Sequence, residues 1–388
     1  MKTIKKLKDK RKVYLTVSTA RKKRNLDRKK AKLERLRSDT TRDQKLTKSH
    51  PEIVLNSSKK FTAGKKGFKN IVVPEKLNLI KNYSETIEFI RIFRQYAIGM
   101  RHPIALVFNE VNEISPEALI LLLAELYRCR KLFGSNKVTG TYPKNRKIEK
   151  LMNDSGFFNL LNVSPRIKKK SKNYPLEYIE FITGNKLIES TASDLRIALL
   201  GNKIEMGIIA KKRLFRAVTE AMINVSNHAY PRTKAKNVIR DQWWISGHIN
   251  KKTNELIILF CDLGVGIPET IPKIHGWERI RAALSILPTI KPNDAEMIKA
   301  GMEIGRTRTG VDGRGNGLND LRKFVDDTGG GELCIFSRKG QYIYRAGQGD
   351  SMKNHNYSIG GTLIKWSVPI KNVTNWLNSE VDFESTHD

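Results

Sequence analysis

Hydrophobic residues along the chain follow two repeating patterns, and together these predict alternating strands and helices. Short apolar runs such as Ile104 to Phe108 and Leu256 to Cys261 are typical of buried strands. A helix is predicted from about Met206 to His228, where apolar residues recur every three or four positions. Ser115 followed by Pro116 is typical of a helix start, since Ser caps free backbone N–H groups and Pro fits the first turn. The pattern predicts an α/β protein.

Further elements predict two α/β regions, at 71–186 and 187–372, between a basic arm at 1–70 and a tail at 373–388. The first region is expected to contain, after the Ser115 helix, a strand at 138–142, a helix at 146–153 and a strand at 177–183. The second is expected to contain a helix at 195–200, strands at 243–249 and 256–261, a long segment of mixed character at 269–312, a helix at 318–325, a hairpin of 333–337 with 342–345, and a last strand at 362–368.

Charge is concentrated near the start of the chain. The protein has 388 residues with 72 Lys and Arg against 39 Asp and Glu, and residues 1–50 alone hold 20 basic and 5 acidic residues. Such an arm is expected to attract nucleic-acid phosphates without reading sequence; the alternative is a solvated arm that binds nothing specific. Within residues 1–50 the only Phe, Trp or Tyr is Tyr14, so the basic stretches lack a pattern of interleaved rings for base stacking.

Two observations bear on the compartment. The longest apolar run, Ala118 to Ala124, is far shorter than the roughly 20 residues that cross a bilayer, and no apolar stretch follows the basic N-terminus. Cys129, Cys261 and Cys334 are scattered, with no spacing typical of a disulfide framework or a structural zinc site. A cytoplasmic protein without membrane contact is expected.

The helix that ends at His228 has the first chemically suggestive pattern. Its apolar positions, Leu214, Val218, Ala221 and Val225, form one face. Glu220, Asn224 and Asn227 gather on a flank beside that face. An amide oxygen can ligate Mg²⁺, and a carboxylate one turn away can orient or deprotonate a hydroxyl. The alternative is a polar surface face.

Three glycine-containing motifs follow along the chain. The strand at 256–261 leads into Asp262-Leu-Gly264-Val-Gly266, where a carboxylate can accept from an exocyclic amine and glycines let the backbone approach a flat base. The sequence GRGNGL at 313–318 precedes a helix, whose N-terminal N–H groups suit phosphates. Gly361-Thr362 opens the last strand. Each motif alone also fits an ordinary turn.

The order of these motifs resembles the GHKL ATP-binding superfamily, which includes gyrase, histidine kinases, anti-sigma serine kinases and MutL. The resemblance covers about 190–370, through EAMINVSNHAY at 220–230, DLGVGIP at 262–268, GRGNGL at 313–318 and Gly361-Thr362. It implies an α/β sandwich with a mixed sheet, ATP between helices and sheet, and residues 269–312 as a lid.

The resemblance also implies roles for individual residues. Asn224 would be the Mg²⁺ ligand, Asp262 the adenine acceptor, and Glu220 the catalytic base. The other expected ATP-binding residues are Gly264 and Gly266 under the base, Gly313, Gly315 and Gly317 in the phosphate loop, and Thr362 as a second adenine contact.

Residues 75–185 resemble a STAS domain, the small module of anti-sigma antagonists, through IALVF, NEVNEIS and the PEAL helix start. In that family a Ser at this turn is a phosphorylation site, and Ser115 is the nearest counterpart. This sequence departs from the usual Asp-Ser-Ser/Thr-Gly run, and the interpretation preferred here is that Ser115 is a helix N-cap.

The expected function is that of a Mg²⁺-ATP-dependent GHKL ATPase or serine/threonine kinase in a regulatory role, acting on a protein partner or as a homodimer. One alternative is an ATP-dependent nucleic-acid clamp that uses residues 1–70. The other is a nucleotide-sensing module with negligible turnover.

Overall fold

The computed structural model describes residues 67–167, 176–185, 208–231, 239–250, 253–287, 289–306 and 317–371. Several expectations lie outside these residues: the arm up to residue 66, the helix at 195–200, the phosphate-loop glycines Gly313 and Gly315, and the tail from 373. The arm was expected to reach residue 70, but the first strand, β1, already begins at Lys69.

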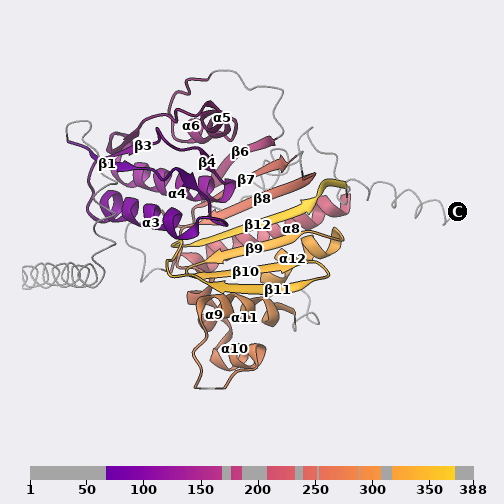
Figure 1. The fold of residues 1–388 in the computed structure, drawn as a ribbon. Helices are drawn as coiled ribbons and strands as arrows, with labels where there is room; N and C mark the ends of the chain where they lie inside the picture. The colour runs from indigo at the N-terminus through magenta and orange to yellow at the C-terminus, as the bar shows by residue number, and fades with distance from the viewer. Residues whose placement is uncertain are drawn as a thin grey trace, which may run out of the picture. The chain divides into compact units, whose positions relative to one another are not determined.

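A seven-stranded sheet forms the centre of the described structure, in the order β11-β10-β9-β12-β8-β7-β6 (Figure 1). Its strands are β6 (Leu176–Gly184), β7 (Trp243–Asn250), β8 (Glu255–Asp262), β9 (Glu332–Ser337), β10 (Gly340–Arg345), β11 (Gly349–Asn354) and β12 (Thr362–Pro369). Every pair among these strands is antiparallel, so the mixed sheet that the resemblance implied is wrong for this sheet. Most of these strands were predicted, whereas β11 was not.

Helices α8 (Ile208–Asn224) and α12 (Gly317–Asp327) cover one face of this sheet (Figure 1). The predicted apolar face of α8 is buried there, against strand residues such as Ile258, Phe260 and Trp366. Strand side chains alternate between faces, so Trp244 and Phe336 point the other way. Burial of the apolar side chains on both faces of the sheet supplies the main driving force for folding.

The other face of the sheet is covered by elements from residues 67–160. They are a parallel sheet of β1 (Lys69–Val72), β3 (Ile104–Val107) and β5 (Val138–Gly140), the short pair β2 (Lys76–Leu77) and β4 (Glu113–Ile114), and the helical segments α3 (Tyr83–Phe93), η1 (Arg94–Gly99), α4 (Pro116–Phe133), α5 (Arg146–Asp154) and α6 (Phe157–Leu160). Tyr127 of α4 packs edge-on against Trp244, and Tyr83 of α3 stacks with Phe336. Residues 67–167 and the large sheet thus belong to one compact unit, Ala63–Asp388.

Helix α4 is buried along almost its whole circumference. Its residues from Ala118 to Leu126 are all buried, because one side faces the parallel sheet and the other faces the large sheet. Ser115 caps the helix by accepting from the N–H of Ala118 at 3.3 Å, which confirms the N-cap interpretation. Glu117 in the first turn pairs with Lys365 of β12 at 3.3 Å.

Strand β6 was expected to complete the first α/β region, but it pairs with β7 at the edge of the large sheet. Its bulge between Ile179 and Ile182 is the only irregularity in that pairing among the described residues. The chain therefore enters the large sheet before it reaches α8.

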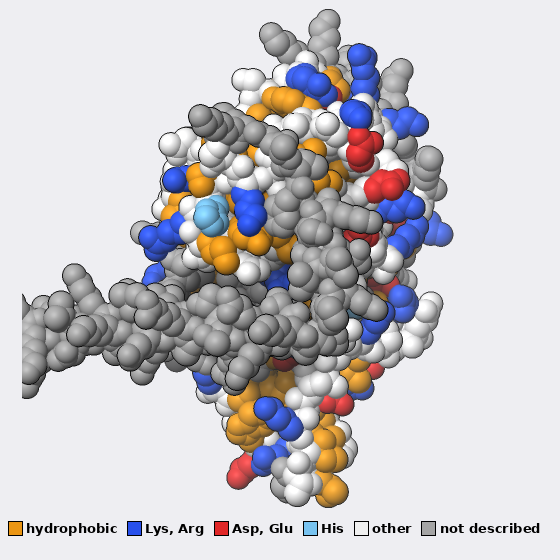
Figure 2. Space-filling model, turned by 60° about the vertical axis from the view of Figure 1, so that its left-hand side comes forward, with side chains coloured by type: hydrophobic (Ala, Val, Ile, Leu, Met, Phe, Trp, Pro, Cys, Tyr) orange, Lys and Arg blue, Asp and Glu red, His pale blue; other side chains and the backbone are white. Residues whose placement is uncertain are grey.

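Helices α9 (Ile267–His275), α10 (Trp277–Leu284) and α11 (Asp294–Arg306) occupy the segment that the resemblance assigns to a lid. Helix α11 packs against β10 and β11, and α9 and α10 form a projection below it in the view of Figure 1. Hydrophobic side chains are visible on this projection in Figure 2, and Ile274, Trp277, Leu287 and Ile290 are exposed. Elsewhere on the face shown, Lys and Arg side chains are spread more widely than Asp and Glu side chains (Figure 2).

Candidate functional site

The C-terminal half of α8 supplies one wall of a cavity of about 360 Å³. Glu220, Asn224, Asn227 and His228 all line it. The α-helix changes to a π-helix over Val225–Ala229, and such local widening of a helix is frequent at functional sites. Burial lowers the pKa of His228, which favours the neutral form of its ring.

Asp262 lies at the end of β8, directly opposite Thr362 of β12 and Trp243 of β7. Its carboxylate accepts from the N–H of Gly264 at 2.7 Å and from Thr362. The Thr362 hydroxyl also lies 3.0 Å from the Ser337 hydroxyl. Only 5% of Asp262 is exposed, and this burial raises the pKa of its carboxyl to about 7, although the hydrogen bonds favour the charged form.

The two glycines after Asp262 have different surroundings. Gly266 lines the cavity at the start of α9. Gly264 is not among the described lining residues, and it packs against the end of the π-helix instead: an added Cβ would lie 2.5 Å from the carbonyl oxygen of Ala229. Gly264 thus has a close packing contact in this structure, and its place under the base stays a prediction.

Gly264→Ala is expected to lower the free energy of unfolding by about 1–3 kcal/mol, because the methyl group would push β8 and the π-helix apart. Urea denaturation measures this loss. Gly99→Ala is the matched control, since its new methyl would meet its nearest atom at 3.8 Å. If Gly264→Ala and Gly99→Ala were equally stable, close packing of Gly264 against the π-helix would be contradicted.

Apolar side chains complete the cavity. Phe260 and Ile364 extend from the sheet, Ile271 and Ile274 from α9 and Leu318 from α12. Thr270 of α9 and the backbone of Gly301 of α11 also line the cavity. Apart from Leu318, the last residue of GRGNGL, these residues lie outside the predicted motifs. Two of them could have been predicted from strand alternation. Phe260 lies two positions before Asp262 and Ile364 two positions after Thr362, so each shares a face of the sheet with its polar neighbour. Gly317 begins α12 beside Leu318, so the described end of the expected phosphate loop reaches the cavity.

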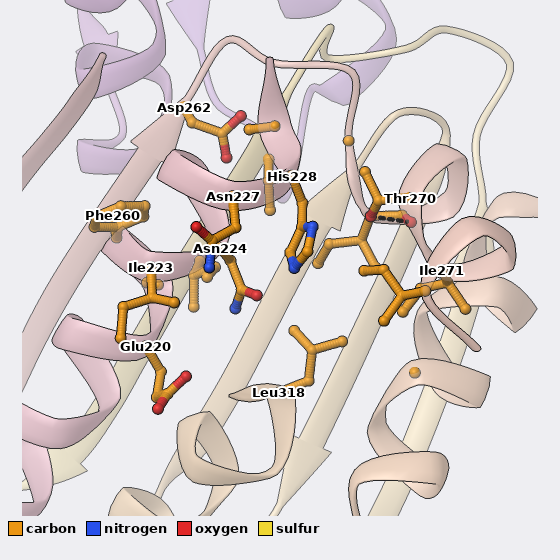
Figure 3. Close-up of a pocket in the computed structure, with 18 of the residues that line it drawn as sticks. Glu220, Ile223, Asn224, Asn227, His228, Phe260, Asp262, Thr270, Ile271 and Leu318 are labelled. Carbon is orange, nitrogen blue, oxygen red and sulfur yellow. Dashed lines mark hydrogen bonds between the residues drawn. The ribbon is translucent and has the colours of Figure 1, made fainter. Parts of the chain in front are cut away.

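The polar groups are distributed along the cavity in a definite order (Figure 3). Asp262 lies at one end, Glu220 at the other, and Asn224 between them. Contacts agree with this view: the N–H of Val265 donates to the carbonyl of Ala229, so the end of the π-helix adjoins the Asp262 turn. From Glu220 to Ala229 the helix rises about 13 Å, enough to separate the base of a nucleotide from its last phosphate.

Glu220 lies in an electrostatic environment shared by two helices. Asp320 of α12 is buried and pairs with Arg216 of α8 at 2.8 Å and with Lys323 at 2.9 Å. Partial burial and the Asp320 carboxylate raise the pKa of Glu220, whereas Arg216 lowers it. A base whose pKa moves toward neutrality is better matched to proton transfer near pH 7.

Asn224 is the one predicted metal ligand, and its surroundings limit the kind of site. In the described part of the chain, no three His, Cys, Asp or Glu side chains gather as a metal cluster. A single amide oxygen with Glu220 one turn away fits Mg²⁺ that takes most of its ligands from phosphates and water, as Mg²⁺ commonly does in nucleotide sites. The residues present therefore fit Mg²⁺ delivered with a nucleotide.

Cys129, Cys261 and Cys334 are free and buried. Among the helices described, none combines the length and apolar character needed to cross a membrane.

No known protein-family model matches the sequence, and the comparison with curated proteins also gave no match.

Proposed function

We propose that residues 208–371 bind Mg²⁺-ATP as a GHKL-type ATPase or serine/threonine protein kinase with a regulatory role, joined to a STAS-like module. The observation that carries this proposal is the shared cavity. Glu220, Asn224, Asp262, Gly266 and Thr362 come from three stretches of sequence and all line it.

Each end of the cavity favours a different part of the nucleotide. At the Asp262 end, a buried carboxylate beside the Thr362 hydroxyl can accept from the exocyclic amine of adenine, while Phe260 and Ile364 give apolar walls for the ring. Burial raises the free energy of the ionised Asp262 carboxylate, and a ligand that donates a hydrogen bond to it offsets part of that free energy. Adenine therefore suits this end.

At the other end, Glu220 would accept the proton of an attacking hydroxyl. That hydroxyl, from water or from a Ser or Thr of a protein partner, bonds to the terminal phosphorus as the bond to the bridging oxygen breaks and ADP leaves. Mg²⁺ bound through Asn224 would neutralise phosphate charge. Incubation with γ-labelled ATP distinguishes the products: label in free phosphate indicates an ATPase, label in protein indicates a kinase, and label retained in ATP indicates a sensor.

Asn224→Ala is expected to remove the gain in ATP affinity that Mg²⁺ gives, a loss of about tenfold. Calorimetric titration with and without Mg²⁺ measures it. Asn227→Ala is the matched control, because Asn227 lines the same cavity on the same helical segment. An unchanged Mg²⁺ effect in Asn224→Ala would exclude this residue as the ligand.

A further inference from the structure

The segment 355–361, which leads into β12, is held on one side by the β9–β10 turn. The N–H of His355 donates to the carbonyl of Lys339 at 2.8 Å, and the N–H of Ile359 donates to the carbonyl of Arg338 at 2.8 Å. These two bonds hold the segment at His355 and Ile359 against the large sheet.

On its other side, the same segment contacts residues 83–94 of the N-terminal region. The Tyr83 hydroxyl donates to the carbonyl of Tyr357 at 2.8 Å, and the Tyr83 ring stacks on His355 with 3.6 Å between ring centroids. The Arg94 guanidinium donates through Nη2 to the carbonyl of Ile359. Side chains from α3 and η1 thus bind backbone atoms of a segment more than 250 positions away.

Arg94 is itself held in a fixed orientation. Its Nε lies 2.7 Å from Oε1 of Glu125 on α4, and the Glu125 side chain is fully buried. Glu125 also pairs with Arg128 one turn further along α4. A buried carboxylate between two guanidinium groups is stable only when its hydrogen bonds keep good geometry, so Glu125 restricts where Arg94 can point.

From Ile359 the chain reaches the base end of the cavity within three residues. Gly361 packs so tightly on the backbone carbonyl of Asp262 that no side chain fits there. The carbonyl of Gly361 accepts from the Ser337 hydroxyl at 3.2 Å, and that hydroxyl lies 3.0 Å from the hydroxyl of Thr362. The position of Ile359 therefore bears directly on how Thr362 meets Asp262.

We infer that Arg94 is a positioning residue for base recognition: held by Glu125, it fixes the segment 355–361 so that Thr362 and Asp262 present one hydrogen-bonding edge to adenine. This inference rests on the proposed function. It makes the N-terminal region a structural part of the nucleotide site, because Arg94, Glu125 and Tyr83 all lie outside the residues that the GHKL resemblance covers.

Arg94→Met and Arg128→Met test the inference as a matched pair. Each removes one guanidinium from Glu125, but of these two arginines only Arg94 has a described hydrogen bond to residues 355–361. Arg94→Met is expected to weaken ATP binding by about tenfold and GTP binding by less, so that the preference for ATP falls. Arg128→Met is expected to keep the wild-type preference. A loss of preference that is equal in both variants would overturn the inference, since it would reflect stability alone.

Two further measurements keep the test decisive. Tyr83→Phe removes only the hydroxyl bond to Tyr357 and keeps the ring on His355, so a smaller fall in ATP preference is expected even if Arg94→Met does not fold. Hydrogen exchange in the nucleotide-free protein should rise at 355–362 in Arg94→Met, and less in Arg128→Met. If the wild-type protein binds no nucleotide, the proposed function fails, whereas unchanged exchange at 355–362 would refute the positioning role itself.

Discussion

Asp262→Asn is expected to make the nucleotide-free protein more stable at pH 8 while abolishing its preference for adenine nucleotides. The substitution keeps the size of the side chain and an oxygen that can accept from the Gly264 N–H. It removes a buried negative charge and places a donor where the carboxylate presents acceptors. Stability and binding should therefore change in opposite directions.

The sign of the stability change follows from the pKa of Asp262. Burial raises this pKa from 3.8 to about 7, so the folded protein holds a proton that the unfolded chain has already lost between these two values. Stability contributed by this group is present at low pH and declines as pH rises from about 4 to about 7. Asp262→Asn removes that decline, so the stability of the variant relative to wild type should rise between pH 5 and pH 8.

Thermal unfolding at pH 5 and pH 8 measures the effect on stability. The difference in unfolding temperature between Asp262→Asn and wild type should be larger at pH 8 than at pH 5. Titration with ATP measures the effect on binding. Wild-type affinity should fall as pH drops below about 7, where the nucleotide-free Asp262 takes up a proton. A variant that binds ATP as tightly as wild type would remove Asp262 from the base site.

The second large effect is expected from Glu220→Gln, which should slow phosphate release or transfer by about 10²- to 10⁴-fold. The amide keeps the shape of the side chain but cannot accept the proton, so binding of ATP should change little. Rapid-quench measurement with γ-labelled ATP separates these two steps. A variant that retains the wild-type rate would show that Glu220 is not the base.

The pH profile of the rate provides a matched check on Glu220. Burial and the nearby Asp320 carboxylate raise the pKa of Glu220, so the rate should rise with pH through a range above that usual for Glu. Asp320→Asn removes one of these causes and should move the rising limb to lower pH. If the rising limb of the pH–rate profile stays in place in Asp320→Asn, the ionising group that controls the rate is not Glu220.

Most secondary structure was predictable because local patterns carry it. Ser115-Pro116 marks the start of α4, and the apolar spacing in α8 matches its buried face. Strand β11 was missed because its sequence, GDSMKN, is exposed throughout and has no apolar alternation. Helix α3 was also missed, although Ile87 and Ile90 have helical spacing and both are buried.

Pairings between distant segments could not be predicted in the same way. Asp262 and Thr362 were both singled out, but their register across β8 and β12 joins residues 100 positions apart. Likewise Arg216 and Asp320, which set the charge around Glu220, are separated by 104 positions and show no local signal. Strand β6 was predicted as a strand of the first α/β region, but it pairs with β7 in the large sheet, because its own sequence does not specify its neighbour.

The placement of β6 affects how the protein can be divided into fragments. A cut near residue 186, where the two α/β regions were expected to separate, would remove the edge strand of the large sheet together with the α3 and α4 cover. Trp244 and Phe336 would then lose the tyrosine rings that pack on them and become part of a broad apolar surface in water. A fragment that keeps both faces of the large sheet covered therefore has to begin upstream of β1, at an N-terminal boundary before Lys69.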